Sequence, residues 1–347
     1  METLEFLSHR VAFAGLPEKE LQQILDCVRV GETWSEACMR SAGRLRRLAA
    51  DSPPADRQAT AQAWQRAACA YHAASFGLHL EPEKYVQLGR ILRLRGLARL
   101  AHRRALQVDA GMGRQIQIPF EAGAVEGYLR ASSRPGAPVI VLLNGLDSIC
   151  EVEMHAFSSW LLAHGLSALS LDLPSSFSSR PRRPSFAVEK LATPLADWIN
   201  AQTQFARSRL GAFGVSFGGH LVARLMAGDA RFRAGVSVSP PAWIGAHELQ
   251  LKRVRLMFAC AFDLHSESEI EATSGRISIE HVPRAEGRIL MLQMQYDQLF
   301  GQEHADAFRA WGRDAVEVRR LAAEHVGTSL AHRWLPEVCD WLNRNLS

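Results

Sequence analysis

The sequence of 347 residues lacks the features that would place it in a membrane or outside the cell. No stretch contains the run of about 18 apolar residues that a membrane-spanning helix needs, so we expect no contact with a membrane. The first residues, Met1 to Glu5, lack the basic and apolar regions of a signal peptide. The sequence therefore predicts a cytoplasmic protein.

Lysine is scarce, since only four of the 40 basic residues are lysines, and the formal net charge is a mild +4. No basic run interleaved with aromatic residues occurs, which argues against binding of nucleic acid. The six cysteines show no C-x-x-C spacing, which argues against a metal site and predicts reduced, mostly buried thiols. We expect no metal and no cofactor.

An apolar fraction of 47% with 22% charged residues is typical of globular proteins, and the length predicts one large or two smaller units. Residues 1–112 have helical periodicity and are predicted to form a helical, cap-like domain, with Pro82 in the first turn of one helix. We interpret the apolar stripes as helix-to-helix core, and leave open that some aromatic residues line a ligand cavity. The stripes contain Leu21, Ile24, Leu25, Trp34, Cys38, Leu45, Leu48, Trp64, Tyr71, Ile91, Leu92 and Leu100.

Residues 113–347 alternate between short apolar strands and helices, which predicts a doubly wound, mainly parallel α/β sheet. The unbroken apolar run 138–143 predicts a strand buried on both faces, followed by a helix over 151–164. A helical insertion at about 241–280 interrupts the alternation. We expect this insertion to act as a lid and, together with the helical domain, to cover the site.

The stretch from Gly214 to Gly219, Gly-Val-Ser-Phe-Gly-Gly, matches the G-x-S-x-G nucleophile elbow, with an apolar strand before it and a helix after it. Gly214 and Gly218 remove side chains that would collide in the sharp turn. The turn would hold the Ser216 hydroxyl at the mouth of the sheet and place the Phe217 amide where it can donate to an oxyanion. The motif alone is also found in ordinary links between a strand and a helix, so the flanking elements carry the interpretation.

A serine nucleophile needs a base and a carboxylate that orients the base. Asp297 follows one apolar strand and His325 follows the last strand, so both should lie at the carboxyl edge of the sheet, in the order Ser, Asp, His. The alternatives are a loop-capping aspartate and a surface histidine. The competing histidines fit less well: His304 and His332 fall inside predicted helices, His281 precedes a strand, and His220 is interpreted as structural.

The loop after the strand 138–143 should supply the second oxyanion donor. Gly145 allows close approach of the backbone, so the Leu146 amide is the candidate. Asp147 and Glu151 could turn into the same site, as an additional acid or as substrate-binding groups. Capping of the following helix explains Glu151 equally well.

From about residue 115 the chain resembles the α/β-hydrolase superfamily. More narrowly, it resembles the branch with a helical N-terminal domain that includes 2,6-dihydroxypseudooxynicotine hydrolase and the bacterial fermentation–respiration switch protein. The residues that carry this resemblance are Trp34, Ala67 to Tyr71, Asn144 to Asp147 with Glu151, Gly214 to Gly219, Asp297 and His325. Two positions depart from the family pattern. Cys150 stands where a lysine is usual, and a serine-rich stretch (172–179) replaces a glycine-rich turn.

The resemblance implies a serine hydrolase that cleaves an acyl bond, carbon–carbon or ester, of a small aromatic or polyketide-like metabolite of secondary metabolism. Carbon–carbon cleavage would need a further acid, for which Glu151 is the candidate. A thioesterase or acyl-eliminating tailoring enzyme, and a non-catalytic regulatory binding protein, remain alternative functions. Formation of a homodimer is left open. The arginines at 180, 182 and 183 are interpreted as a solvated loop, with steering of an anionic substrate as the alternative.

Overall fold

The computed structural model describes residues 2–53, 56–78, 87–121, 123–172, 187–205 and 209–347. The helix start predicted at Pro82, the serine-rich stretch after residue 172 and the three arginines lie outside the described residues. Among the described helices, none combines the length and the apolar character that crossing a bilayer requires.

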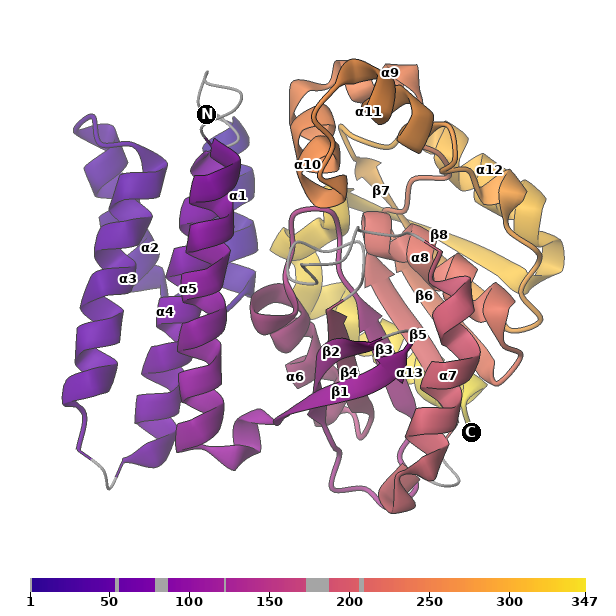
Figure 1. The fold of residues 1–347 in the computed structure, drawn as a ribbon, viewed down its shortest axis with the longest axis horizontal. Helices are drawn as coiled ribbons and strands as arrows, with labels where there is room; N and C mark the ends of the chain where they lie inside the picture. The colour runs from indigo at the N-terminus through magenta and orange to yellow at the C-terminus, as the bar shows by residue number, and fades with distance from the viewer. Residues whose placement is uncertain (1, 54–55, 79–86, 122, 173–186, 206–208) are drawn as a thin grey trace. The chain divides into compact units, whose positions relative to one another are not determined.

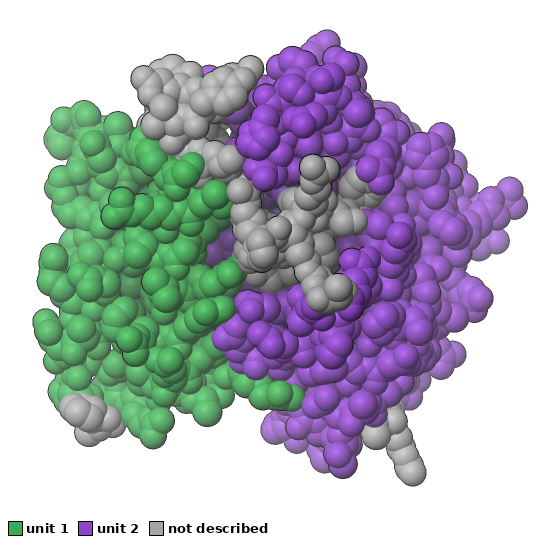
Figure 2. Space-filling model, in the orientation of Figure 1, with its two compact units in different colours: residues 1–114, 151–156 green, residues 115–150, 157–347 purple. Residues whose placement is uncertain are grey.

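The chain forms two compact units, coloured separately in Figure 2. The first consists of Met1–Arg114 together with Glu151–Ala156, and the second of Gln115–Cys150 and Phe157–Ser347. The end of the helical domain is predicted from the sequence at residue 112. Glu151–Ala156 were expected in the catalytic domain but group with the helical unit, where the Glu151 and Glu153 side chains pair with its helices.

The first unit is built from helices (Figure 1). A capping box between Thr33 and Glu36 begins the third helix, and the Asp56 side chain caps the fourth. Trp34 packs against Gly77 and donates its indole N–H to the carbonyl oxygen of Ala73, at 2.9 Å. The helices are α1 (Glu2–Phe13), α2 (Glu18–Arg29), α3 (Trp34–Asp51), α4 (Arg57–Gly77) and α5 (Gln87–Val108).

Most of the predicted apolar stripe residues in the described helices are buried or partly buried, but two are not. Leu48 and Leu100 are 58% and 59% exposed, so their assignment to the core was wrong. Both lie at the edge of a helical stripe, where the three- and four-residue spacing cannot separate a core position from a flanking one. The cysteines are all thiols, and four of the six are buried.

The second unit contains an eight-stranded sheet in the order β1-β2-β4-β3-β5-β6-β7-β8. Strand β2 pairs antiparallel with β4, and the pairs from β4 to β8 are parallel. This confirms the predicted mainly parallel α/β fold. The strands are β1 (Arg114–Phe120), β2 (Gly123–Arg130), β3 (Val139–Leu143), β4 (Ser167–Asp172), β5 (Leu210–Val215), β6 (Phe232–Val238), β7 (Arg288–Tyr296) and β8 (Val316–Glu324).

Helices cover both faces of this sheet, because β5 and β6 are apolar on both sides. On one face, the Phe213 ring contacts Phe157 and Trp334, with ring centroids 5.0 and 6.5 Å apart. On the other face, Gly235 leaves room for Met226, whose sulfur would lie 2.2 Å from an added Cβ. The helices of this unit are α6 (His155–Ala163), α7 (Glu189–Ala201), α8 (Phe217–Gly228), α9 (Ala246–Gln250), α10 (Lys252–Phe262), α11 (Glu267–Ser274), α12 (Gln302–Gly312) and α13 (Ala331–Asn345).

The single helix expected over 151–164 begins instead as a π-helical turn, Cys150–Met154, and continues as α6. Helix α6 therefore starts in the first unit and crosses into the second after Ala156. Turns of π-helix are rare in proteins, and those that occur often lie at functional sites.

Candidate active site

The turn between β5 and α8 holds Ser216 in the left-handed region of backbone space, with φ 53°. The adjacent glycines are sterically required. A Cβ at Gly214 would lie 2.2 Å from the carbonyl oxygen of Gly218, and one at Gly218 would lie 2.1 Å from that of Leu143. A strained serine between β5 and a helix N-terminus is the geometry of a nucleophile elbow. The Phe217 amide lies in the first turn of α8, which favours negative charge.

Asp297 and His325 follow the carboxyl ends of the neighbouring strands β7 and β8, and their side chains meet. His325 Nδ1 and Asp297 Oδ2 are 2.7 Å apart. A carboxylate can only accept, so Nδ1 carries the proton and Nε2 is left as the acceptor. The other oxygen, Asp297 Oδ1, accepts the amides of Leu299 and Phe300, at 2.9 and 3.1 Å.

The environment of Asp297 favours its charged form. Burial raises the pKa of Asp297, but the charge and hydrogen bond of His325 and the two backbone amides outweigh it and hold the pKa below its usual value. The carboxylate is therefore ionised at neutral pH. It can orient His325 and stabilise an imidazolium that forms there.

The loop after β3 is fixed by its own polar groups and approaches the elbow closely. Ser148 Oγ accepts the Gly145 amide at 2.8 Å, and the Asn144 side chain donates to two carbonyls of the loop. A Cβ at Gly145 would lie 3.2 Å from the Cβ of Ser216, so glycine lets the backbone reach the serine. The next residue, Leu146, is buried.

The insertion between β6 and β7 forms α9, α10 and α11, and α10 contacts both the elbow and the loop. The rings of Phe262 and Phe217 are 5.8 Å apart in an edge-to-face arrangement. The Arg253 guanidinium lies 3.3 Å from the Asp147 carboxylate. Asp147 thus belongs to the loop beside Ser216, but its charge already faces a cation.

Glu151 is grouped with the helical unit rather than with Ser216, Asp297 and His325. Its buried carboxylate forms an ion pair with Arg99 Nε at 3.0 Å, and its carbonyl oxygen accepts from the Gln65 side chain. Glu151 does not act as the simple helix cap considered from the sequence, because the π-helical turn begins one residue earlier.

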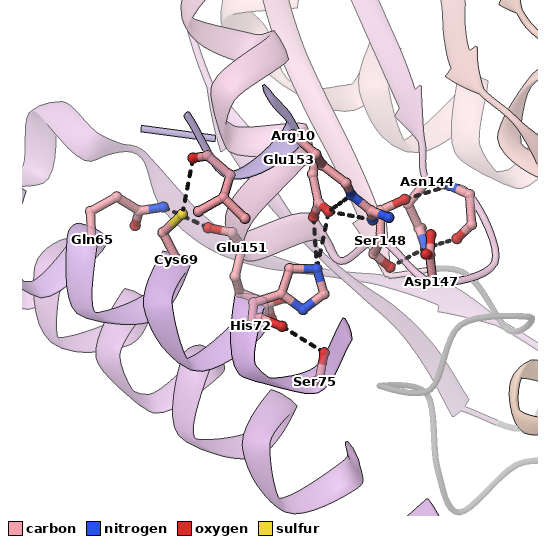
Figure 3. A network of polar contacts seen from close by, with 12 residues as sticks. Arg10, Gln65, Cys69, His72, Ser75, Asn144, Asp147, Ser148, Glu151 and Glu153 are labelled. Atoms are coloured by element: carbon pink, nitrogen blue, oxygen red, sulfur yellow. Dashed lines mark hydrogen bonds and ion pairs between the residues drawn. The ribbon is translucent and has the colours of Figure 1, made fainter. Parts of the chain in front are cut away.

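Sequence reasoning missed a second buried acid two residues further on, Glu153. Figure 3 shows Arg10 and His72 pointing toward it from α1 and α4. Arg10 Nε lies 2.9 Å and His72 Nε2 3.0 Å from its carboxylate oxygens. Arg10 also lies 3.9 Å from the centre of the Phe76 ring. Residues this far apart in the sequence leave no local pattern by which the cluster could be found.

Two of the competing histidines are buried in the second unit. His220 Nδ1 lies 3.1 Å from the carbonyl oxygen of Pro241, and its Nε2 accepts from Arg224 Nε at 3.0 Å. The His304 Nδ1 accepts the Ala242 amide at 3.1 Å, which directs Nε2 to Glu248, 3.6 Å away. Burial lowers the pKa of both histidines. Among the described residues, no three His, Cys, Asp or Glu side chains are arranged to hold a metal ion.

Comparison with solved structures identifies the fold. The chain superposes on 2,6-dihydroxy-pseudo-oxynicotine hydrolase with a TM-score of 0.86 at 16% identity, covering 97% of this chain and 95% of that one. An esterase of Pyrococcus furiosus matches with a TM-score of 0.56 at 20% identity, covering 68% and 92%. At these identities the likeness shows a shared α/β-hydrolase fold.

Sequence comparison identifies the family. The chain is 25% identical over 178 residues to Esterase FrsA of Escherichia fergusonii, covering 49% of this chain and 40% of that protein. It is 27% identical over 225 residues to the hydrolyase poxO of Penicillium oxalicum, covering 60% and 52%. The chain thus spans about half the length of the curated relatives it matches. Residues 18–258 match the Esterase FrsA-like family. The protein belongs to this family and has the α/β-hydrolase fold that its resemblance to that superfamily predicted.

Proposed function

We propose that this protein is an esterase that cleaves the acyl bond of a small apolar metabolite through Ser216, His325 and Asp297. The observation that carries the proposal is the 2.7 Å contact between His325 Nδ1 and Asp297, at the carboxyl ends of β7 and β8 in the same sheet whose strand β5 leads into the strained turn at Ser216. That contact leaves Nε2 as a base, which a serine nucleophile requires.

The reaction runs in two balanced halves. Ser216 Oγ attacks the carbonyl carbon of the ester, and His325 Nε2 takes the hydroxyl proton. The amides of Phe217 and Leu146 donate to the oxyanion. The intermediate collapses, the alkoxide leaves with the proton from His325, and an acyl-serine remains. Water then attacks the acyl-serine, and His325 again acts as the base. His325 returns the proton to Ser216 Oγ as the bond to the acyl group breaks and the acid product is released.

The ion pairs formed by Glu151 and Asp147 favour ester cleavage over cleavage of a carbon–carbon bond. A carbanion leaving group needs a further proton donor, whereas an alkoxide takes its proton from His325. The two acids considered for that task are engaged elsewhere, Glu151 with Arg99 and Asp147 with Arg253. Each of these carboxylates thus already has a guanidinium partner.

Aromatic side chains next to the proposed catalytic groups support an apolar, aromatic or polyketide-like acyl compound as the substrate. Phe262 of α10 packs on Phe217, and the Phe300 ring lies 5.6 Å from that of His325. Apolar walls with a few convergent polar groups are typical of sites for small organic molecules. The three side chains complete this reaction without a cofactor.

Covalent labelling tests the proposal. A fluorophosphonate probe should label the wild-type protein at Ser216, and the Ser216→Ala variant should remain unlabelled at the same concentration. Parallel assays with p-nitrophenyl esters and matched thioesters would separate an esterase from a thioesterase or an acyl-eliminating enzyme. A folded wild-type protein that resists the probe and hydrolyses neither substrate would instead support a non-catalytic, regulatory binding protein.

A further inference from the structure

The carboxyl end of β6 is hydrogen-bonded to both of the loops that carry the proposed nucleophile and base. On one side, the Ser216 amide donates to the carbonyl oxygen of Val238 at 2.8 Å. On the other side, the amide of Val326, the residue directly after His325, donates to Ser239 Oγ at 3.0 Å. Two consecutive residues, Val238 and Ser239, therefore tie the serine turn and the histidine loop to one point.

This point is itself firmly held. Ser239 is 3% exposed, and its amide donates to the carbonyl oxygen of Leu292 in β7 at 2.8 Å. Two residues earlier, Ser237 Oγ donates to the carbonyl oxygen of Gly219 in the first turn of α8 at 2.9 Å. The end of β6 is thus fixed between the helix after the nucleophile and the strand that leads to Asp297.

The two residues that join across the Ser239 hydrogen bond both have unfavourable backbone conformations. Ser239 has φ 47°, and Val326 has φ 70° with ψ −18°. Positive φ is a genuine outlier for a β-branched residue such as valine. Such conformations are strained and persist only where surrounding contacts enforce them. Without Ser239 Oγ as the acceptor, the backbone of Val326 would relax toward an ordinary φ, and His325 would move with it.

We propose that Ser239 is a positioning residue that sets the approach of His325 to Ser216 by holding the strained residue after the histidine. The inference rests on the proposed triad. Ser239 does not contact the reacting atoms. It acts through the backbone of Val326 and leaves the contact between His325 and Asp297 to fix the ring from the other side.

Replacing Ser239 by alanine removes the acceptor and little else. Because a misplacement of about 1 Å in a catalytic group costs about 100-fold in rate, Ser239→Ala should lower kcat for a p-nitrophenyl ester about 10- to 100-fold, with KM changed less than about twofold. The rate of fluorophosphonate labelling at Ser216 should fall by the same factor, since that reaction uses the same base.

Ser167 provides a matched control in the same unit. It is fully buried in β4, and its Oγ accepts the Ser132 amide at 3.0 Å, the same kind of bond at the same length. Ser167→Ala should lower Tm by a similar amount but change kcat and labelling less than about twofold. Equal labelling rates in the Ser239→Ala and Ser167→Ala variants would overturn the positioning role and leave the triad standing. A wild-type protein that is not labelled would overturn both.

A second background isolates the strain at Val326. Glycine adopts positive φ without steric cost, so in Val326→Gly the loop depends less on the acceptor. The fold-reduction in labelling rate caused by Ser239→Ala should be at least about threefold smaller in the Val326→Gly background than in the wild-type chain. An identical reduction in both backgrounds would contradict the proposed link. If Ser239→Ala alone does not fold, Ser239→Cys, with a weaker acceptor of similar size, should slow labelling in the same direction. Labelling unchanged in the cysteine variant would refute the inference.

Discussion

Lowering the pH from 7.5 to 5.5 should destabilise the protein by about 1 kcal/mol through one buried side chain, His220. Its exposed fraction is 0%. Both ring nitrogens are used in the neutral form, because Nδ1 donates to the carbonyl oxygen of Pro241 and Nε2 accepts from Arg224. A second proton on the ring would face the Arg224 N–H. Burial, and then the charge of Arg224, lower the pKa of His220 to about 3.

The sign and size of the effect follow from proton linkage. The unfolded chain binds a proton at His220 with an ordinary pKa of about 6.5, and the folded chain binds it only near pH 3. This contribution to stability is therefore present above about pH 6.5 and is lost as the pH falls toward 3. At pH 5.5 roughly ten of eleven unfolded molecules are protonated at this ring, which corresponds to about 1 kcal/mol. Because the folded pKa lies far below 5.5, the result depends little on its value.

Urea unfolding at the two pH values measures this loss. In His220→Gln, a neutral amide can donate to Pro241 and accept from Arg224, so the variant should lose about 1 kcal/mol less than wild type on acidification. His332→Gln, at an exposed histidine of α13, is the control and should behave as wild type does. The other buried histidines, which are His72, His102, His304 and His325, are present in all three proteins and cancel in the comparison. An equal pH dependence of wild type and His220→Gln would refute the reasoning.

Three further predictions concern the proposed triad and the acids of the π-helical turn. Ser216→Ala and His325→Ala should each abolish ester turnover, and the double variant should be little worse than either, since triad members act as a unit; additive losses in kcat would contradict a shared step. Glu151→Gln should change kcat for a small activated ester less than about twofold, and a loss of about 100-fold confined to a β-diketone substrate would restore Glu151 as the acid for carbon–carbon cleavage. Glu153→Gln should destabilise the helical unit by about 3 kcal/mol, because it removes the charge that faces buried Arg10; an unchanged urea midpoint would show that the pair contributes nothing.

Local patterns were sufficient to predict the fold, because they describe interactions between near neighbours in the sequence. The unbroken apolar run that became β3, and the glycines around Ser216, have steric or burial requirements that are visible in the sequence. The order of strands and loops also placed Asp297 and His325 at the same edge, where their side chains meet.

Contacts between distant segments were beyond such reasoning. The pairing of Glu153 with Arg10 joins residues 143 positions apart, and that of Val326 with Ser239 joins residues 87 apart. Neither has a spacing that a periodicity could detect. The positive φ of Val326 was equally invisible, since valine is among the least expected residues in that conformation.

The placement of Glu151–Ala156 has a consequence for the order in which the chain folds. Helices α1 to α5 are complete by Val108, yet two of the acids that pair with them follow only after β1, β2 and β3. During synthesis from the N-terminus, buried Arg10 meets the charge of Glu153 only once the first three strands have been made. The helical unit therefore cannot reach its final structure before the chain has been synthesised as far as Glu153. A cut near residue 112 would leave Glu151 and Glu153 on the fragment that lacks the helices they pair with. Such a cut would therefore not separate two autonomous domains.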